Sequence, residues 1–205
     1  MPSLTFNRRL LARHPAVLAK VREEIASTVG LGQDAPQPAR DDIKAMTYLN
    51  HVVKESLRLY PPVPVNQRAA SRNTTIPTGG GADGQSPVFV GEGASVGYLI
   101  YSMHRRRDIY GEDAHAFRPE RWENDALKEV GYGYLPFGAG PRACLGQNFA
   151  LLEALYTVAR LVQWFPWMSL PDGETMEIGK EKQRLTLVLS CAEGCRVRLS
   201  DKASL

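Results

Sequence analysis

The chain has 205 residues, of which 43% are hydrophobic and 23% are charged. This balance is typical of a globular protein and excludes a chain that is disordered throughout. The formal net charge of +3 is too small to indicate nucleic-acid binding, so we interpret the charge as a solvated surface, with an acidic partner as the alternative.

The first predicted element is a helix that starts at Pro15, since proline is tolerated in the first turn of a helix. Gly30 ends it. Before this helix, residues 1–10 carry charge but no long apolar run, so we expect neither a signal peptide nor a membrane anchor in this chain. The predicted buried face of the helix consists of Val17, Leu18, Val21 and Ile25.

A second helix is predicted over residues 43–60, and the two prolines that follow it end it. Its apolar face would consist of Met46, Leu49, Val53, Leu57 and Tyr60. Short strands are expected from 63 to 96, with the clearest at 74–76 and 88–90. The three glycines at 79–81 are not followed by a helix with a lysine, which argues against a phosphate-binding loop.

Residues 98–106 suggest a short helix, and residues 108–145 form a long irregular stretch of a kind that usually carries function. The third long helix is expected from 145 to 165. Its polar residues Glu153, Thr157 and Arg160 form one narrow strip, so we expect most of its circumference to be buried. Because charges interrupt its apolar run, this helix is not a membrane span.

The tail predicts a β-hairpin that pairs 185–190 with 196–199 around Glu193 and Gly194. Cys191 and Cys195 beside it are expected to be free thiols, with a disulfide or half of a metal site as alternatives. A zinc site built from all three cysteines and a histidine would have poor ligand spacing. The expected fold class is mainly α with small β-sheets, an α+β arrangement within one domain over residues 1–205.

The segment 137–146, which reads Phe-Gly-Ala-Gly-Pro-Arg-Ala-Cys-Leu-Gly, comes just before the third long helix. At the start of a helix, the backbone N–H groups favour the ionised form of the Cys144 thiol, which is a metal ligand. Gly138 and Gly146 would let the backbone approach a flat ring. Phe137 could shield the sulfur from water, and Arg142 is suited to pair with a carboxylate.

This pattern fixes five positions, and its chance occurrence is on the order of one in several million per start site. It resembles the haem-ligand signature of the cytochrome P450 monooxygenases at every fixed position. The resemblance implies that Cys144 is the axial ligand of haem b, through which a thiolate pushes electron density onto the iron. Phe137, Gly138, Arg142 and Gly146 would then contact the cofactor. A buried cysteine in a turn is the alternative.

Two further motifs occur in the order found in that family: Glu55-x-x-Arg58, and then Pro119-Glu-Arg121 before the cysteine loop. By the resemblance, Glu55, Arg58 and Arg121 form a buried charge network with a structural role, which holds the loop against its supporting helix. The alternative for Glu55 and Arg58 is an exposed ion pair.

Arg68 follows the proline-rich turn, and in similar proteins a basic residue there meets a haem propionate. A solvated arginine is the alternative. His104 is expected to be a packed or surface residue and not an iron ligand.

The resemblance covers residues 10–199 and implies the C-terminal part of the cytochrome P450 fold, with the N-terminal half absent. It implies a haem-thiolate monooxygenase that uses O2, an NADPH-dependent reductase and an apolar substrate, with no nucleic-acid partner. Full members sit on the endoplasmic reticulum membrane. Segments 73–77, 79–84, 110–114 and 131–137 look like the fungal hydroxylases of alkanes and fatty acids. The alternative function is a non-catalytic haem-binding remnant.

Overall fold

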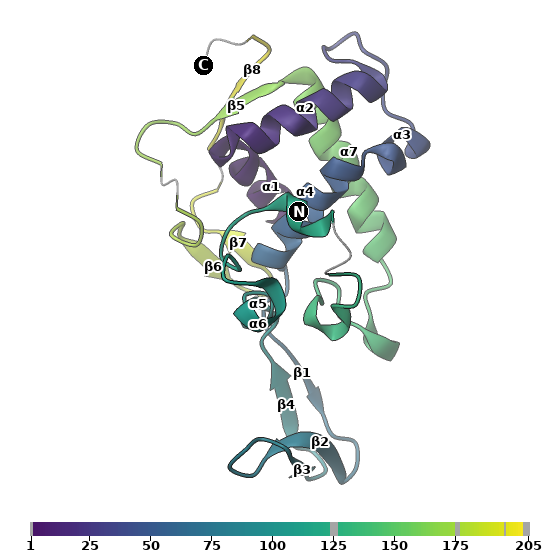
Figure 1. Ribbon diagram of the computed structural model, residues 1–205, viewed down its shortest axis with the longest axis vertical. Helices are drawn as coiled ribbons and strands as arrows, with labels where there is room; N and C mark the ends of the chain where they lie inside the picture. Colours follow the sequence, from purple (N-terminus) through teal and green to yellow (C-terminus); the bar gives the residue numbers. More distant parts are fainter. Residues whose placement is uncertain (1, 124–126, 175–176, 195, 203–205) are drawn as a thin grey trace.

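A computed structural model describes residues 2–123, 127–174, 177–194 and 196–202. As the sequence predicted, the chain combines helices with small β-sheets. In this described part the strands pair two by two into antiparallel sheets, and the longer helices pack together as one body (Figure 1). The helices are α1 (Pro2–Arg13), α2 (Pro15–Val29), α3 (Arg40–Ala45), α4 (Thr47–Leu59), α5 (Ile100–Met103), α6 (Arg107–Tyr110) and α7 (Gln147–Trp164). Single 3-10 turns are η1 (Pro119–Trp122), η3 (Gly131–Gly133) and η4 (Gly140–Arg142).

Helix α4 lies at the centre of the core, where α1, α2 and α7 contact it. The apolar faces predicted for α2 and α4 are confirmed, because every residue assigned to them is buried. Pro15 begins α2 as expected, and Gly30 ends it with a φ of 78° that few other residues adopt. Burial of these faces is the main source of stability for such helices. The buried residues of the two faces are Val17, Leu18, Val21, Ile25, Met46, Leu49, Val53, Leu57 and Tyr60.

The predicted helix over 43–60 is two helices, because the chain breaks at Met46 between α3 and α4. Met46 is fully buried, so its side chain fills the core at the break. The new helix start is capped from another element: the Glu24 carboxylate on α2 accepts the backbone N–H groups of Tyr48 and Leu49, each at 2.8 Å. A cap supplied by a distant helix leaves no local signal in the sequence.

Helix α1, which contains Arg8, Arg9 and Arg13, was not predicted from the sequence. In the structure, long-range ion pairs neutralise two of these arginines. Arg9 Nη2 lies 2.6 Å from the Glu174 carboxylate, and Arg13 Nη2 lies 3.1 Å from that of Glu181. The partners come from the C-terminal segment, so only the tertiary structure makes this helix a buried element.

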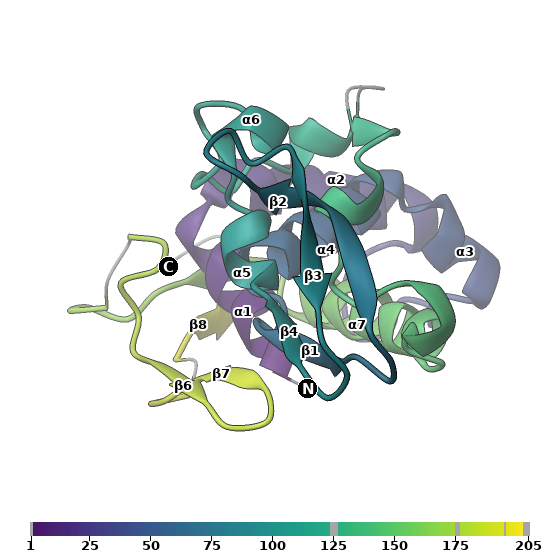
Figure 2. The same ribbon diagram turned by 90° about the horizontal axis from the view of Figure 1, so that it is seen from below.

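Strands β1 (Asn66–Ala69) and β4 (Ser95–Tyr98) pair to form a stem that leaves the helical body (Figure 1). The stem carries the hairpin of β2 (Thr74–Gly80) and β3 (Ser86–Val90), which Figure 2 shows from below. The strands predicted at 74–76 and 88–90 therefore exist and pair with each other. Gly79, with a φ of 119°, lies near the end of β2, where the pairing with β3 shifts register between Ile76 and Gly80, so it is part of this hairpin and not of a phosphate-binding loop.

The predicted C-terminal hairpin is wrong. Strands β6 (Gln183–Leu185) and β7 (Leu189–Cys191) pair with each other, so residues 185–190 fold back on themselves. Strand β8 (Arg198–Ser200) pairs instead with β5 (Trp167–Ser169). Leu187 lies at the turn between β6 and β7 and is exposed, whereas the backbone N–H of Leu189 bonds to the carbonyl of Pro62 at 2.8 Å.

Helix α7 lies within two residues of its predicted bounds, but it is less buried than predicted. Its second half is in the core through residues such as Val158 and Val162, whereas Phe149 in its first half is 71% exposed. The prediction from the narrow polar strip therefore overestimated how much of the surface of α7 is buried. The described residues contain no helix with the length and apolar character needed to cross a membrane.

Candidate functional site

The cysteine loop is held by hydrogen bonds of its own backbone. The N–H of Cys144 donates to the carbonyl of Phe137 at 2.9 Å, and that of Gly138 donates to the carbonyl of Leu135 at 3.2 Å. Gly138 has a φ of 70°, which is in the left-handed region that favours glycine. Helix α7 begins at Gln147, so Cys144 stands in the loop just before the helix. The first bond closes a loop that presents the Cys144 side chain outward, where it is exposed.

The exposed thiol lies in the lining of an apolar cavity of about 360 Å³. One wall is the cysteine loop and the first half of α7. The rest of the lining comes from the end of α4, the segment after it and Ile100. The lining residues are Leu57, Pro62, Val63, Asn66, Ile100, Pro136, Phe137, Gly138, Arg142, Cys144, Ala150, Leu151 and Ala154.

The chemistry of this lining fits an iron porphyrin. Cys144 offers one sulfur donor, and the surrounding side chains are mostly apolar, as the flat ring of the cofactor requires. Arg142 offers a guanidinium group that can pair with a propionate of the porphyrin. Close beside the sulfur lies Gly146, where a Cβ would come within 3.9 Å of the Cys144 Sγ atom.

The structure brings Phe137, Gly138, Arg142 and Cys144 to this one cavity. Two other predicted contacts lie outside the lining. Gly146 is the N-cap residue of α7. The exposed side chain of Arg68 donates to the side-chain oxygen of Asn66 at 3.0 Å and to the carbonyl of Gln67 at 2.8 Å. Because Asn66 lines the cavity, Arg68 stands at its edge.

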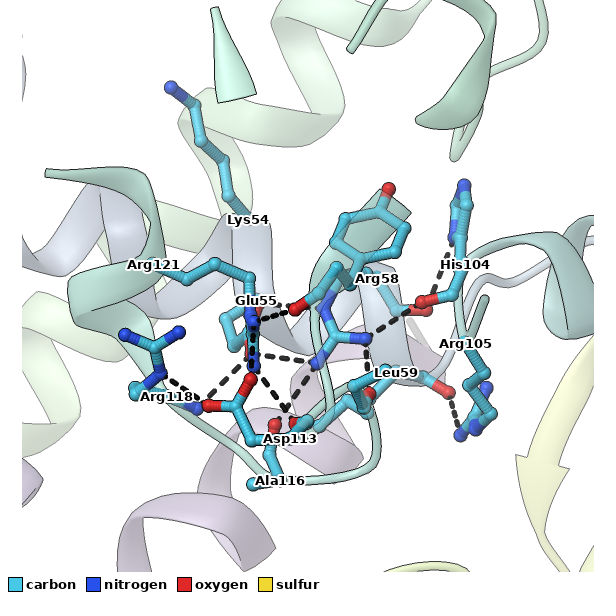
Figure 3. Close-up of polar contacts among 12 residues, drawn as sticks. Lys54, Glu55, Arg58, Leu59, His104, Arg105, Asp113, Ala116, Arg118 and Arg121 are labelled. Atoms are coloured by element: carbon cyan, nitrogen blue, oxygen red, sulfur yellow. Dashed lines mark hydrogen bonds and ion pairs between the residues drawn. The ribbon is translucent and has the colours of Figure 1, made fainter. Parts of the chain in front are cut away.

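Glu55, Arg58 and Arg121 meet in the interior beside this site (Figure 3). The Glu55 carboxylate accepts two bonds from the Arg58 guanidinium, both at 2.8 Å, and lies 3.3 Å from Nε of Arg121. Glu55 and Arg58 are completely buried and Arg121 is 6% exposed. Such charges are stable in an interior only when each has its partners.

Sequence reasoning missed two members of this network. Trp122 donates its indole N–H to Glu55 at 3.0 Å, and Asp113 accepts from Arg121 at 2.9 Å. The hydrogen bond from Arg121 lowers the pKa of Asp113 below its ordinary value. The tryptophan directly follows the Pro-Glu-Arg motif, so its position carried a signal. Asp113 could not have been found from its own irregular segment.

His104 is fully buried beside Arg58, consistent with a packed residue. Its Nδ1 lies 3.1 Å from the carbonyl oxygen of Arg58, and its Nε2 accepts the backbone N–H of Leu135 at 2.8 Å. Burial lowers the pKa of His104 to about 4. The ring is therefore neutral at physiological pH.

Cys191 lies in β7, away from the cavity, and Cys195 lies outside the described residues. The prediction of free thiols at these two positions therefore stays a prediction. Within the part of the chain that the structure describes, no three His, Cys, Asp or Glu side chains gather in a way that could hold a metal ion. This gives no support to a zinc site.

The sequence profile of the family described as Cytochrome P450 matches residues 4–190. Among curated proteins, the chain is 58% identical over 200 residues to a protein named Cytochrome P450 of Arthroderma benhamiae, with 96% of this chain and 40% of that protein aligned. It is 49% identical over 199 residues to Cytochrome P450 52A13 of Debaryomyces hansenii, covering 96% of this chain and 37% of the relative. The identity to Cytochrome P450 52A1 of Candida tropicalis is 47% over 191 residues, covering 92% and 35%. The chain thus spans about two fifths or less of the length of these relatives.

Proposed function

The chain belongs to the cytochrome P450 family, and we propose that it is the haem-binding C-terminal part of a haem-thiolate monooxygenase, with Cys144 as the axial ligand of haem b. One observation carries the proposal: the exposed thiol of Cys144 lies in the lining of an apolar cavity that Arg142 also reaches. We further propose that residues 1–205 form one partial domain, since the family profile extends over residues 4–190.

When bound, the haem iron supplies the activation of O2, and the surrounding chain determines where that chemistry takes place. Cys144 would hold the iron through its thiolate sulfur, from a loop that the hydrogen bond between the Cys144 N–H and the Phe137 carbonyl closes. Phe137 lines the same cavity and would limit water near the sulfur once the cofactor is bound. Arg142, which also lines the cavity, would pair with a propionate of the cofactor. Arg68 is proposed to hold a second carboxylate from the cavity edge.

The proposed substrate is an apolar small molecule, for which a long-chain alkane or fatty acid is the candidate. The apolar cavity lining supports an apolar ligand, and the segments of fungal hydroxylase type at 73–77, 79–84, 110–114 and 131–137 support the substrate class. The proposed electron donor is an NADPH-dependent reductase. The proposed location of the whole protein is the endoplasmic reticulum membrane. Product analysis with alkanes and fatty acids of several chain lengths tests the substrate class, and no oxidation at any length would contradict it.

The test of the iron ligand is Cys144→Ser, with Cys191→Ser as the matched control. Serine keeps the shape of the side chain but removes the thiolate, so the ferrous–carbonyl spectrum should lose its thiolate type in Cys144→Ser alone. Cys191 lies in strand β7, outside the cavity lining, and should not affect that spectrum. An unchanged spectrum in Cys144→Ser would show that another group holds the iron.

A second measurement distinguishes the monooxygenase from the non-catalytic haem-binding remnant. The chain is loaded with haem, mixed with a reductase and an apolar substrate, and followed for product. A thiolate-type spectrum together with product supports the monooxygenase. A thiolate-type spectrum without product would identify the haem-binding remnant.

A further inference from the structure

His104 occupies the space between the buried charge network and the start of the cysteine loop. It is the C-terminal cap of α5 and is fully buried. Figure 3 shows it beside Arg58, on the side opposite Arg118. Its own carbonyl accepts Nη1 of Arg58 at 2.7 Å. The histidine is therefore bonded to Arg58 through its backbone as well as through its ring.

The hydrogen bonds assign one tautomer to this ring. Because the backbone N–H of Leu135 can only donate, the Nε2 atom of His104, 2.8 Å away, must accept and carries no proton. The ring proton is then on Nδ1, from which it donates to the carbonyl of Arg58. Burial, which lowers the pKa of the ring, keeps this tautomer neutral. One ring thus joins two backbone segments with one donor and one acceptor.

From Leu135 a series of backbone bonds leads to the sulfur-bearing residue. The carbonyl of Leu135 accepts the N–H of Gly138, and the carbonyl of Phe137 accepts the N–H of Cys144. Between them, Pro136 and Phe137 form part of the cavity wall. The position of Leu135 therefore sets where the loop begins, and the loop sets where the Cys144 side chain points.

We propose that His104 is a positioning residue that connects the buried Glu55–Arg58 network to the cysteine loop by holding the backbone N–H of Leu135. The proposal deepens the proposed function and, as far as haem ligation is concerned, rests on it. It accounts for how a network on α4 can set the geometry of a loop that its charged side chains do not bond directly. A role in packing alone is the alternative, because the ring also stacks on Tyr134 at 5.3 Å.

Two substitutions of similar polarity separate these roles. His104→Gln places an amide oxygen near the position of Nε2 and can still accept from Leu135, but it loses the donor to Arg58. His104→Asn keeps a donor near the position of Nδ1 and loses the acceptor. Each variant loses the ring stack and one hydrogen bond, so a packing role predicts similar effects. A positioning role predicts that only His104→Asn disturbs the loop.

The first readout needs no cofactor. Amide hydrogen exchange of Leu135 and Cys144 is measured in the full 205-residue chain and in both variants. We expect exchange to be about tenfold faster in His104→Asn, as loss of one hydrogen bond implies, and near the original rate in His104→Gln. The amide of Ala150, which bonds to Gly146 at the start of α7, serves as the internal control. Equal acceleration in both variants, or none in His104→Asn, would overturn the proposal.

The second readout is the fraction of the bound haem that gives a thiolate-type ferrous–carbonyl spectrum after haem loading. It should fall severalfold in His104→Asn and be restored in His104→Gln. If the original chain bound haem without a thiolate spectrum, the proposed function would fail, while the exchange comparison would still decide whether His104 positions the loop. Equal spectra in the two variants would contradict the positioning role.

Discussion

At the scale of single residues, the carboxylate of Glu55 is the acceptor on which several elements converge. It accepts from Arg58 of its own helix, from Arg121 and Trp122 of η1, and from the backbone N–H of Arg118. In its fully buried position, this charge is stable only because these donors surround it. We propose that the network has a structural role, which is to hold the irregular segment and the cysteine loop against α4.

We expect Glu55→Ala to abolish haem incorporation. It leaves the charge of Arg58 buried without its carboxylate, at a cost of about 3–5 kcal/mol in the free energy of unfolding. Arg58→Ala should act in the same way. The matched control is Asp41→Ala, which removes the exposed i,i+3 pair of Asp41 with Lys44 and should cost at most about 0.5 kcal/mol. Urea unfolding and haem content check both changes; full haem occupancy in Glu55→Ala would refute the structural role.

The buried ring of His104 also predicts how stability changes with pH. Its pKa falls from 6.5 to about 4, mainly through burial, with the nearby charges of Arg58 and Arg105 acting in the same direction. The unfolded chain takes up this proton below about pH 6.5, whereas the folded chain does not until about pH 4. The neutral His104 ring therefore makes its full contribution to the free energy of unfolding above pH 6.5, and this contribution decreases as the pH falls towards 4.

Over that window the loss is on the order of 3 kcal/mol. His104→Gln should remove this part of the pH dependence. Burial also lowers the pKa of His14 and His51, so the difference between the original chain and the variant is the quantity to compare. The measurement is the free energy of unfolding at several pH values between 4 and 7. Parallel curves for the two proteins would show that the ring titrates normally.

At the scale of elements, the start of α4 depends on a residue of α2. Glu24 accepts the N–H groups of Tyr48 and Leu49, which otherwise have no partner within their helix. Since α4 also carries Glu55 and Arg58, its first turn connects the helical body to the charge network. The carboxylate also interacts favourably with the positive end of the helix dipole.

Removing this cap should lower stability without changing the cavity chemistry. We expect Glu24→Ala to cost about 1 kcal/mol in the free energy of unfolding, the usual effect of losing an N-cap. Glu23→Ala is the matched control, because Glu23 is the neighbouring glutamate on the same helix. Thermal unfolding of the two variants measures the difference. Equal melting temperatures would mean that water replaces the carboxylate at no cost.

At the scale of the whole molecule, apolar side chains remain exposed around the cysteine loop and α7. Leu145, directly after Cys144, is fully exposed and Phe149 is 71% exposed. Phe149 borders a groove that also contains Ile43, Leu152 and Tyr156. Large apolar side chains that are exposed next to such a groove promote association.

We therefore expect the chain to self-associate in the absence of detergent. Phe149→Gln should reduce the apparent mass measured by light scattering. The matched control is Phe89→Gln, because Phe89 is also 71% exposed but lies on the β2–β3 hairpin away from the helical body (Figure 1). A monodisperse monomer that melts cooperatively would contradict this expectation.

The amino-acid sequence by itself determined the features that depend on local pattern. The apolar faces of α2 and α4, the bounds of α7 and the β2–β3 strands follow from periodicity and from proline and glycine positions. The fixed positions around Cys144 resembled the signature of the cytochrome P450 family, and the match of the family profile to residues 4–190 confirms the family. Cys144, Glu55, Arg58 and Arg121 all lie in motifs whose spacing along the chain is enough to name them.

Only the tertiary structure decided the features that depend on distant partners. Helix α1 is buried because Glu174 and Glu181 neutralise its arginines, and α4 begins where Glu24 caps it. The tail pairs β8 with β5 and not within one hairpin. The Nε2 atom of His104 accepts the backbone N–H of Leu135, which lies 31 positions further along the chain. In each case a charged or hydrogen-bonding group has its partner far away in the sequence. A local sequence pattern does not indicate which distant residue will be that partner.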